Sequence, residues 1–206
     1  MKIIALSCSP SKGRNSDSML DYFIKGASQI NGINIEKIYL DDLEIDYYCY
    51  ENRNGAEEHE KEFARISNIL QKEAVGVIIS SPTYNFSVPA KLKNFIDRIG
   101  FFALDFSKKT KLNQPIGTLK HLNFYFIVSG GTPIWVQKII FFILPLFWLK
   151  IVFKYFGANN LGSFYSGDIK AFKNKKILDK CYKKGIKYAK QLSKKQEKKI
   201  SRMFFW

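Results

Sequence analysis

Apolar runs rich in Ile, Val and aromatic residues recur along the chain, and between them apolar residues lie three and four positions apart. An uninterrupted run indicates a strand buried on both faces, and the wider spacing indicates a helix with one apolar side. Strands are predicted at Lys2–Ser7, Ile33–Leu40, Val75–Ser80, Leu122–Val128 and Asn160–Ser166. Helices are predicted at Ser16–Ile30, Glu57–Lys72, Val88–Gly100 and, at the end of the chain, Lys170–Lys199.

Strands that alternate with helices of this length predict a parallel sheet with helices on both faces, because the crossovers between parallel strands are right-handed. We therefore expect an α/β fold, a doubly wound three-layer sandwich around a five-stranded parallel sheet. Ligands of such sheets bind beyond the carboxyl ends of the strands. The segments that follow the strands are thus the places to look for a site.

The length of 206 residues suits one compact domain, which we place at residues 1–199, followed by a short aromatic tail at 200–206. The three cysteines, Cys8, Cys49 and Cys181, are scattered and form no CxxC pair, which predicts neither a disulfide framework nor a zinc site. A reducing, cytoplasmic location fits this pattern best. The first apolar run is too short for the core of a signal peptide and is interpreted as a strand.

The net charge of +15 belongs to the second half of the chain. Residues 1–100 carry 12 basic and 14 acidic side chains, whereas residues 101–206 carry 21 basic and 4 acidic ones. Such a surface attracts a phosphorylated cofactor, an acidic membrane or a nucleic acid without choosing among them. The lysines show neither a recognition-helix motif nor interleaved aromatics on a strand platform, so we expect no nucleic-acid partner.

The segment after the first strand, Ser7–Asp17, reads SCSPSKGRNSD and leads into a helix that begins near Ser16 or Asp17. Small hydroxyl and amide groups at a helix N-terminus can surround a phosphate. The candidate phosphate ligands are Ser9, Ser11, Asn15 and Ser16, with Lys12 or Arg14 to neutralise the charge. The alternative is that Ser16 or Asp17 only caps the helix.

The segment after the third strand, Ser81–Arg98, reads SPTYNFSVPAKLKNFIDR. Two prolines fix its geometry, and two aromatic residues lie where a flat ring could stack. The candidate residues are Pro82, Thr83, Tyr84, Asn85 and Phe86. The alternative is that the aromatic residues pack beneath the loop as part of the core.

The segment after the fourth strand reads SGGT and contributes Ser129, Gly130 and Gly131. Adjacent glycines allow a close approach of a ligand to the backbone or a positive φ. The alternative is an ordinary turn from a strand to a helix.

Taken together, SPSKGRNSD, SPTYNFSVPAKLKNFIDR and the spacing to SGG resemble the NAD(P)H-dependent FMN reductase family over about residues 1–131. This flavodoxin-like family includes quinone reductases and iron–sulfur flavoproteins. The resemblance implies FMN as cofactor and NAD(P)H as co-substrate. It places the FMN phosphate at Ser9, Ser11, Asn15 and Ser16, and the isoalloxazine between Pro82–Phe86 and Ser129–Gly131.

Two departures from the family pattern matter. Many relatives have an arginine at the position of Ser11, so Lys12 or Arg14 must neutralise the phosphate here. Iron–sulfur members carry a cysteine cluster after the second strand, where this chain has only Cys49, and four thiolates normally hold a cluster. We therefore expect no iron–sulfur centre and no other metal.

The resemblance implies that electrons pass through the flavin to a small acceptor such as a quinone, a nitro compound or another flavin. The cofactor carries this chemistry, so no catalytic side chain is expected, and the chain has only His59 and His121 for histidine chemistry. The alternative is a flavodoxin-type electron carrier without its own NAD(P)H activity. Such carriers are typically acidic, unlike this chain.

Residues 134–156 form a long apolar segment that contains eleven consecutive apolar residues, Ile139–Leu149. That run spans about 16 Å as a helix, which is short of the hydrocarbon core of a bilayer, roughly 30 Å thick. We expect a helix kinked at Pro145 that buries both faces. The resemblance suggests a homodimer interface across the flavin, and the alternative is shallow insertion into an anionic membrane with lysines at the headgroups.

The last predicted helix has a basic outer face and an apolar face made by Leu178, Cys181, Gly185, Ala189 and Leu192. The chain then ends in Phe204, Phe205 and Trp206. A cationic helix with an aromatic end suggests an interfacial membrane anchor, and the alternative is a solvated helix with a disordered end. Peripheral contact with an anionic membrane is therefore a hypothesis that rests on the apolar segment and the tail together.

Overall fold

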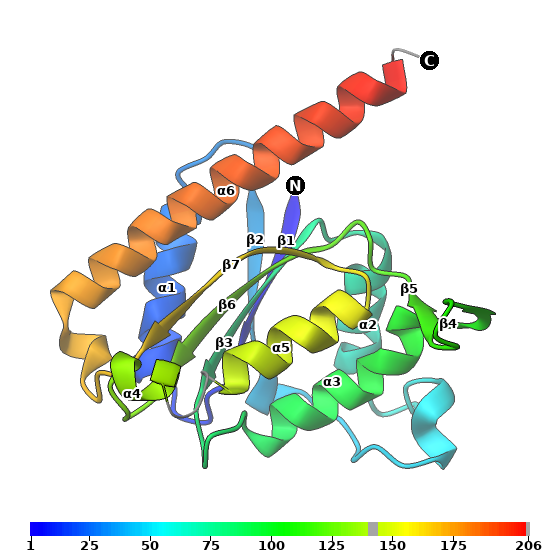
Figure 1. Cartoon of the computed structure of the whole chain (residues 1–206), viewed down its shortest axis with the longest axis horizontal. Coiled ribbons are helices and arrows are strands. Elements are labelled where there is room, and N and C mark those ends of the chain that lie inside the picture. Colours follow the sequence, from blue (N-terminus) through cyan, green and yellow to red (C-terminus); the bar gives the residue numbers. More distant parts are fainter. Residues whose placement is uncertain (140–143, 205–206) are drawn as a thin grey trace.

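Five strands form one parallel sheet at the centre of the molecule (Figure 1). The structure is a computed structural model, and it describes residues 1–139 and 144–204. The strands of the sheet are β1 (Lys2–Ser7), β2 (Asn34–Tyr39), β3 (Gly76–Pro82), β6 (Asn123–Ser129) and β7 (Asn159–Ser166). Their order is β2-β1-β3-β6-β7, and all neighbours are parallel. The predicted five-stranded parallel sheet is confirmed.

Helices cover both faces of this sheet, which makes the predicted three-layer sandwich. One face carries α1 (Asn15–Ala27) and α6 (Lys175–Phe204), and the other carries α2 (Lys61–Lys72), α3 (Ala90–Ala103) and α5 (Leu144–Tyr155). Each face has its own apolar core, and every residue of β6 is buried. The apolar runs in the sequence therefore arise because the central strands are covered on both sides.

The helix α6 packs against α1 and the sheet through the face that the sequence predicts. Leu178, Cys181, Gly185, Ala189 and Leu192 are all buried. A Cβ atom at Gly185 would clash with the carbonyl oxygen of Phe23 in α1, so the close approach of the two helices requires glycine there. The helix continues to Phe204 and projects beyond the sheet, so the boundary proposed at residue 199 falls inside it (Figure 1).

The structure describes two helical parts of the apolar segment 134–156, for which we expected one helix kinked at Pro145. They are α4 (Ile134–Ile139) and α5 (Leu144–Tyr155), and residues 140–143 lie outside the described residues. Pro145 is the second residue of α5 as the structure describes it, and the predicted kink there involves residues 140–143 and so lies outside the described residues. Among the described helices, none combines the length and the apolar character needed to cross a bilayer.

A small antiparallel hairpin, which the sequence did not predict, follows α3. It consists of β4 (Leu104–Lys109) and β5 (Pro115–Gly117). Three short 3-10 helices, η1 (Leu40–Asp42), η2 (Glu51–Asn54) and η3 (Ala171–Lys173), lie in loops.

Candidate functional site

The three candidate segments meet at the carboxyl edge of the sheet. In the register of the parallel strands Ser7 lies opposite Ser80, and Pro82 lies opposite Ser129. Backbone hydrogen bonds join the loops just beyond the strands, from Cys8 N to Ser80 O at 2.8 Å and from Thr83 N to Ser129 O at 2.7 Å. The structure therefore brings together the segments that sequence analysis assigned to one site.

The loop between β1 and α1 is tightly folded and leads to Ser16, whose buried hydroxyl has no hydrogen-bond partner among the described residues. The hydroxyl oxygen of Ser9 accepts the Ser11 N–H at 3.1 Å, and Gly13 turns the chain with φ of +73°. The helix begins at Asn15, so Ser16 lies in its first turn, and the proposed capping role of Ser16 or Asp17 is wrong. Ser16 is 1% exposed, and its Oγ has no hydrogen-bond partner among the described residues.

The carboxylate of Asp17 stabilises this loop through hydrogen bonds and an ion pair. This buried carboxylate accepts hydrogen bonds from the Ser7 hydroxyl and the Gly13 N–H, both at 2.7 Å, and pairs with Lys37 Nζ of β2 at 2.8 Å. Burial by itself raises the pKa of Asp17, but the donors from Gly13, Lys37 and Ser7 outweigh it and hold that pKa below its usual value. From the sequence, Asp17 was predicted only as an alternative helix cap, so this role was missed.

The other charged and amide candidates of the first loop already have partners. Lys12 Nζ pairs with the Asp42 carboxylate at 2.8 Å and lies over the Tyr39 ring, and Arg14 lies over the ring of Phe172. Asn15 donates to Ile169 O and accepts from Phe172 N, both at 3.1 Å. These contacts connect the loop between β1 and α1, which we call the phosphate-side loop, to neighbouring segments. Lys12 and Arg14 are exposed and lie at the rim of this loop.

The loop after β3 contains a tight turn with two strained residues. Tyr84 and Ser87 exchange backbone hydrogen bonds at 3.0 and 2.9 Å, and the two residues between them, Asn85 and Phe86, have φ of 48° and 65°. A left-handed conformation is unusual for a bulky residue such as phenylalanine and marks functional sites. Tyr84 and Phe86 are each 46% exposed, so the alternative that they pack beneath the loop is wrong.

The glycine loop after β6 is shaped by its neighbours in the fold. A Cβ atom at Gly130 would lie 2.6 Å from the Tyr165 hydroxyl and 3.4 Å from Thr83 Oγ1, whereas one at Gly131 would meet nothing closer than 3.6 Å. The Tyr165 hydroxyl donates to Thr132 O at 2.8 Å and so fixes the loop. Thr83 Oγ1 is buried and has no partner within the described part of the chain.

The loop after β2 is anchored by the helix of the second motif. The guanidinium of Arg98, which is 2% exposed, binds both carboxylate oxygens of the fully buried Glu60 at 2.6 and 2.7 Å. Burial by itself raises the pKa of Glu60. The hydrogen bonds from Arg98 and from two backbone N–H groups have a larger, opposite effect, so the pKa of Glu60 lies below its usual value. The same loop places Tyr48 against Phe101, with ring centroids 5.6 Å apart. The arginine of the motif therefore organises the loop.

The two histidines lie away from the loops of the carboxyl edge. His59 is exposed and contacts the Asp46 carboxylate at 3.1 Å, and His121 contacts Leu70 O at 3.1 Å near the opposite edge of the sheet. Among the described residues, no three His, Cys, Asp or Glu side chains are grouped so that they could hold a metal ion.

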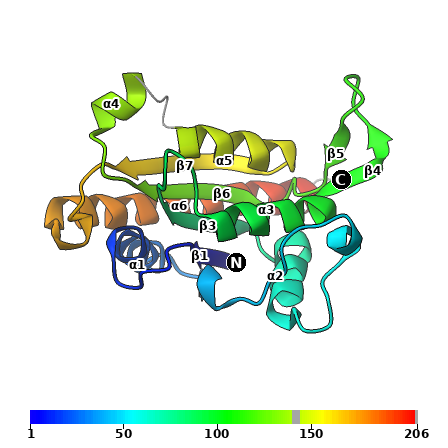
Figure 2. The same ribbon diagram turned by 90° about the horizontal axis from the view of Figure 1, so that it is seen from below.

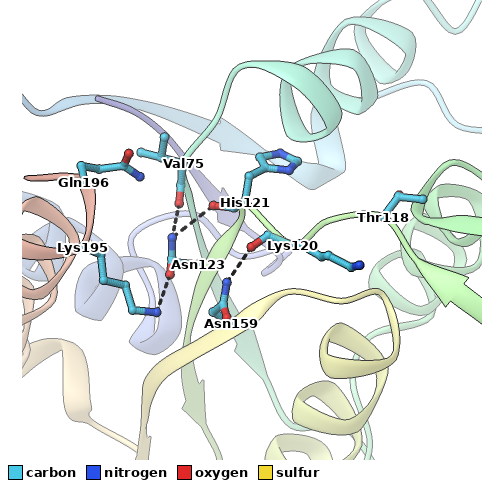
Figure 3. A pocket seen from close by; sticks show the side chains of 8 residues that line it. All are labelled: Val75, Thr118, Lys120, His121, Asn123, Asn159, Lys195 and Gln196. Carbon is cyan, nitrogen blue, oxygen red and sulfur yellow. Dashed lines mark hydrogen bonds between the residues drawn. The ribbon is translucent and has the colours of Figure 1, made fainter. Parts of the chain in front are cut away.

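A cavity of about 510 Å³ lies at this opposite, amino edge of the sheet (Figure 3). Asn123 is at its centre, donates to Val75 O and His121 O, and accepts from Lys195 Nζ at 3.0 Å. Asn159 donates to Lys120 O at 2.8 Å. Three of the polar side chains that line this cavity, Asn123, Asn159 and Lys195, are thus already hydrogen-bonded to its wall.

A second hollow, an apolar groove of about 600 Å³, runs between α3, α5 and the hairpin. Tyr48, Phe101 and Phe106 stack along it, with ring centroids 5.6 and 5.7 Å apart. Trp148 of α5 lines the same groove, and the only carboxylate of the lining, Asp97, pairs with Lys93 at 2.6 Å.

The carboxyl edge fits FMN by the chemistry of its donors. A buried hydroxyl without a hydrogen-bond partner costs about 1–3 kcal/mol. Two such hydroxyls lie at this edge: Ser16 Oγ, just after the phosphate-side loop, and Thr83 Oγ1, in the loop after β3. Ser16 lies in the first turn of α1, where unpaired N–H groups attract a phosphate. The exposed aromatic turn is next to Thr83. One ligand with an anionic end and a flat polar ring would satisfy both oxygens.

Two known proteins illustrate the sequence similarity of this chain. The chain is 33% identical over 137 residues to an FMN-dependent NADH:quinone oxidoreductase of Metamycoplasma arthritidis, which is 64% of this chain and 69% of that protein. It is 31% identical over 101 residues to an iron-sulfur flavoprotein of Archaeoglobus fulgidus, which is 48% of this chain and 46% of that one.

Among solved structures, an azoreductase of Bacillus anthracis superposes with a TM-score of 0.69 at 17% identity, over 92% of this chain and 99% of that one. A flavodoxin from the domain Archaea superposes with a TM-score of 0.56 at 15% identity, over 94% and 99%. These likenesses confirm the flavodoxin-like fold. The profile of the family described as NADPH-dependent FMN reductase matches residues 1–130, and this match over more than half of the sequence makes the chain a member of that family.

Proposed function

We propose that the protein is an FMN-dependent NAD(P)H oxidoreductase that passes electrons to a small conjugated acceptor. One observation carries the proposal: two buried hydroxyl oxygens, Ser16 Oγ and Thr83 Oγ1, lack partners at the edge where the three loops meet. The membership of the FMN reductase family supplies the identity of the ligand that satisfies them. When bound, FMN would supply the hydride-accepting and electron-transferring chemistry, which side chains do not perform.

At the phosphate end, the residues of the protein bind and orient the FMN phosphate. Ser16 Oγ and the backbone N–H groups at the start of α1 donate to the phosphate, and Ser9 and Ser11 shape the loop around it. Asp17 keeps the loop closed by holding the Gly13 N–H, and Lys37 neutralises that carboxylate so that it does not repel the anion. Lys12 and Arg14 contribute positive charge from the rim.

At the ring end, the residues position a flat group and exclude water from one side of it. Thr83 Oγ1 donates to the polar rim of the ring, and the strained turn presents Tyr84 and Phe86 for stacking. Ser129, Gly130 and Gly131 lie along the neighbouring side, held by Tyr165. Pro82 ends β3 just before this turn, and Asn85 lies within it. No side chain at this edge is needed as a general acid or base.

The acceptors named for the relatives set the class of substrate that we propose. Relatives are named as quinone reductases and structural neighbours as azoreductases, and both names refer to planar conjugated acceptors. A quinone, an azo compound or a nitro compound would stack at the exposed turn once the nicotinamide has left. The relatives' names favour NADH, and the description of the family favours NADPH, so both belong in the assay.

A second copy of the chain is the partner that we propose for the apolar groove. Its aromatic lining, Tyr48, Phe101, Phe106 and Trp148, is large and partly exposed, and its charges, Lys93 and Asp97, neutralise each other. Two such grooves can therefore meet without repulsion of like charges. Phe106→Glu should convert a dimer into a monomer in light scattering after gel filtration, and a wild-type monomer would contradict the proposal.

The setting that we propose is a reducing cytoplasm with peripheral association to a membrane. The three cysteines are free, which suits a reducing compartment. The unusual exposure of apolar residues on α4 and α5 supports the membrane part.

The test of the main proposal is direct. Purified protein should be yellow or should bind added FMN stoichiometrically, and the holoprotein should oxidise NADH or NADPH with menadione as acceptor. An electron carrier, the alternative function, would bind FMN but show negligible turnover without a partner reductase. A colourless protein that does not bind added FMN would overturn both.

A further inference from the structure

The outer side of α5 is apolar although it faces solvent. Leu144, Phe147 and Ile151 are 43%, 58% and 50% exposed, and their spacing of three and four residues places them on one side of the helix. The other side is filled by Leu149 and Phe153, which are buried in the core. An ordinary surface helix carries polar residues on its outer side, so this side is suited to a further partner.

The short helix α4 extends the same exposed region. Ile134, Trp135 and Ile139 are 45%, 63% and 69% exposed. Figure 2 shows α4 projecting from the molecule at the β7 side of the sheet, with α5 beside β7 at that side. We refer to these residues as the α4–α5 apolar surface: Ile134, Trp135, Ile139, Leu144, Phe147 and Ile151.

The charged residues of the two helices that carry this surface are all basic. Residues 134–156 contain Lys138, Lys150 and Lys154 and no Asp or Glu. Within the described residues, no carboxylate lies within ion-pair distance of Lys150 or Lys154, in contrast to Lys93 of the groove, which pairs with Asp97. A second copy of this chain, with a net charge of +15, would bring these lysines against their own counterparts. An anionic partner would pair with them.

We propose that the α4–α5 apolar surface docks on an anionic lipid bilayer, with its apolar side chains at the boundary of headgroups and acyl chains. Lys150 and Lys154 lie at the headgroup phosphates in this arrangement. A lipid surface suits the composition, because interfacial helices combine large apolar residues with flanking lysines and do not need the length of a span. The basic outer face of α6 is not part of this contact, because α6 covers the opposite face of the sheet from α5.

Docking in this way brings the candidate site close to the lipid. The helix α4 begins two residues after Thr132 of the glycine loop, so the carboxyl edge lies next to the docked surface. This consequence rests on the proposed function, and it favours an acceptor that dissolves in the membrane, such as a long-tailed quinone. The docking itself requires no activity and is tested without it.

The experiment is flotation of the full-length, FMN-loaded protein with vesicles of phosphatidylcholine alone or with phosphatidylglycerol added. We expect binding to the anionic vesicles that falls at least tenfold in the double variant Phe147→Ser with Ile151→Ser. The matched control removes two exposed apolar side chains elsewhere, Tyr47→Ser with Leu112→Ser, which are 82% and 83% exposed, and should bind as the wild type does. Circular dichroism confirms that both variants fold.

A second pair of variants tests whether the lysines of α5 or those of α6 contribute to vesicle binding. Lys150→Gln with Lys154→Gln should weaken vesicle binding at least fivefold, whereas Lys183→Gln with Lys187→Gln on the exposed side of α6 should change it less than twofold. The proposal is overturned if the wild type binds no vesicles, if it binds neutral vesicles equally well, or if only the α6 pair abolishes binding. It is also overturned if the variant Phe147→Ser with Ile151→Ser changes from a dimer to a monomer but still binds anionic vesicles as the wild type does.

Fluorescence supplies a readout at the surface itself. Trp135 belongs to the surface, Trp148 lies beside it in α5, and the third tryptophan, Trp206, is removed by Trp206→Phe. Brominated lipids in anionic vesicles should quench the remaining emission by at least a third. Emission that stays unquenched while the protein floats with the vesicles would place the contact elsewhere and overturn the proposal.

Discussion

The two edges of the sheet hold their polar side chains in opposite ways. At the amino edge, a cavity of about 510 Å³ has at its centre the side chain of Asn123, which is hydrogen-bonded to Val75, His121 and Lys195 (Figure 3). At the carboxyl edge, Ser16 Oγ and Thr83 Oγ1 are buried without partners, and Asn85 and Phe86 are held at positive φ. Unmet hydrogen bonds and backbone strain thus occur together at the proposed site, whereas the centre of the amino-edge cavity is hydrogen-bonded.

Ser16→Ala should produce the largest difference between the edges. It removes a donor to the phosphate, which we expect to weaken FMN binding by about 2.5 kcal/mol, roughly 70-fold, as measured by fluorescence titration. The free energy of unfolding without FMN should not fall, because the hydroxyl has no partner to lose.

Ser67→Ala is the matched control for this variant. Ser67 Oγ in α2 is also buried without a partner among the described residues, but it lies away from the carboxyl edge. Its loss should leave FMN affinity within twofold of wild type. An equal loss of affinity in both variants would contradict the role given to Ser16.

Asn123→Ala tests the amino edge and should show the opposite pattern. The variant leaves His121 O without its donor and Lys195 without its acceptor, so we expect a loss of about 2 kcal/mol in the free energy of unfolding by urea. FMN affinity should be unchanged. Gln196→Ala, which lines the same cavity, should cost less than about 0.5 kcal/mol, and an effect of Asn123→Ala on FMN binding would contradict the comparison.

Gly130→Ala tests whether the carboxyl edge depends on packing as well as on donors. Its Cβ atom would lie 2.6 Å from the Tyr165 hydroxyl, which must then move and release Thr132 O. We expect FMN to bind about 1.5 kcal/mol more weakly, roughly tenfold. Gly131→Ala meets nothing closer than 3.6 Å and should change affinity less than threefold, so equal effects of the two variants would contradict this account.

Much of the fold can be predicted from the sequence because the central strands and the helix faces are buried in regular patterns. The hairpin β4–β5 was missed because most of its first strand is exposed, from Phe106 to Lys109, and so shows no apolar pattern.

The meeting of the three candidate loops at one edge could be predicted from the sequence, but the contacts among their residues could not. The sequence places the loops on one edge through the order of strands, yet it cannot show that Asn15 binds Ile169 and Phe172, which are more than 150 residues away. Nor does it pair Asp17 with Lys37, because the pairing depends on the register of β1 and β2. Gly130 was read as an approach to a ligand, whereas its immediate constraint is the Tyr165 hydroxyl.

Acid should affect the carboxyl edge through Asp17, and this is the smallest effect that we expect near neutral pH. Because its folded pKa lies below the ordinary value, Asp17 binds fewer protons in the folded than in the unfolded protein, so its contribution is present above the unfolded pKa, about 3.9. That contribution is lost as pH falls through the folded pKa. The difference in unfolding free energy between wild type and Asp17→Asn should therefore be constant from about pH 5 to 7 and shrink below about pH 4. Urea unfolding at pH 7 and pH 3 measures it, and a difference that does not change with pH would show that the charge of Asp17 does not stabilise the loop.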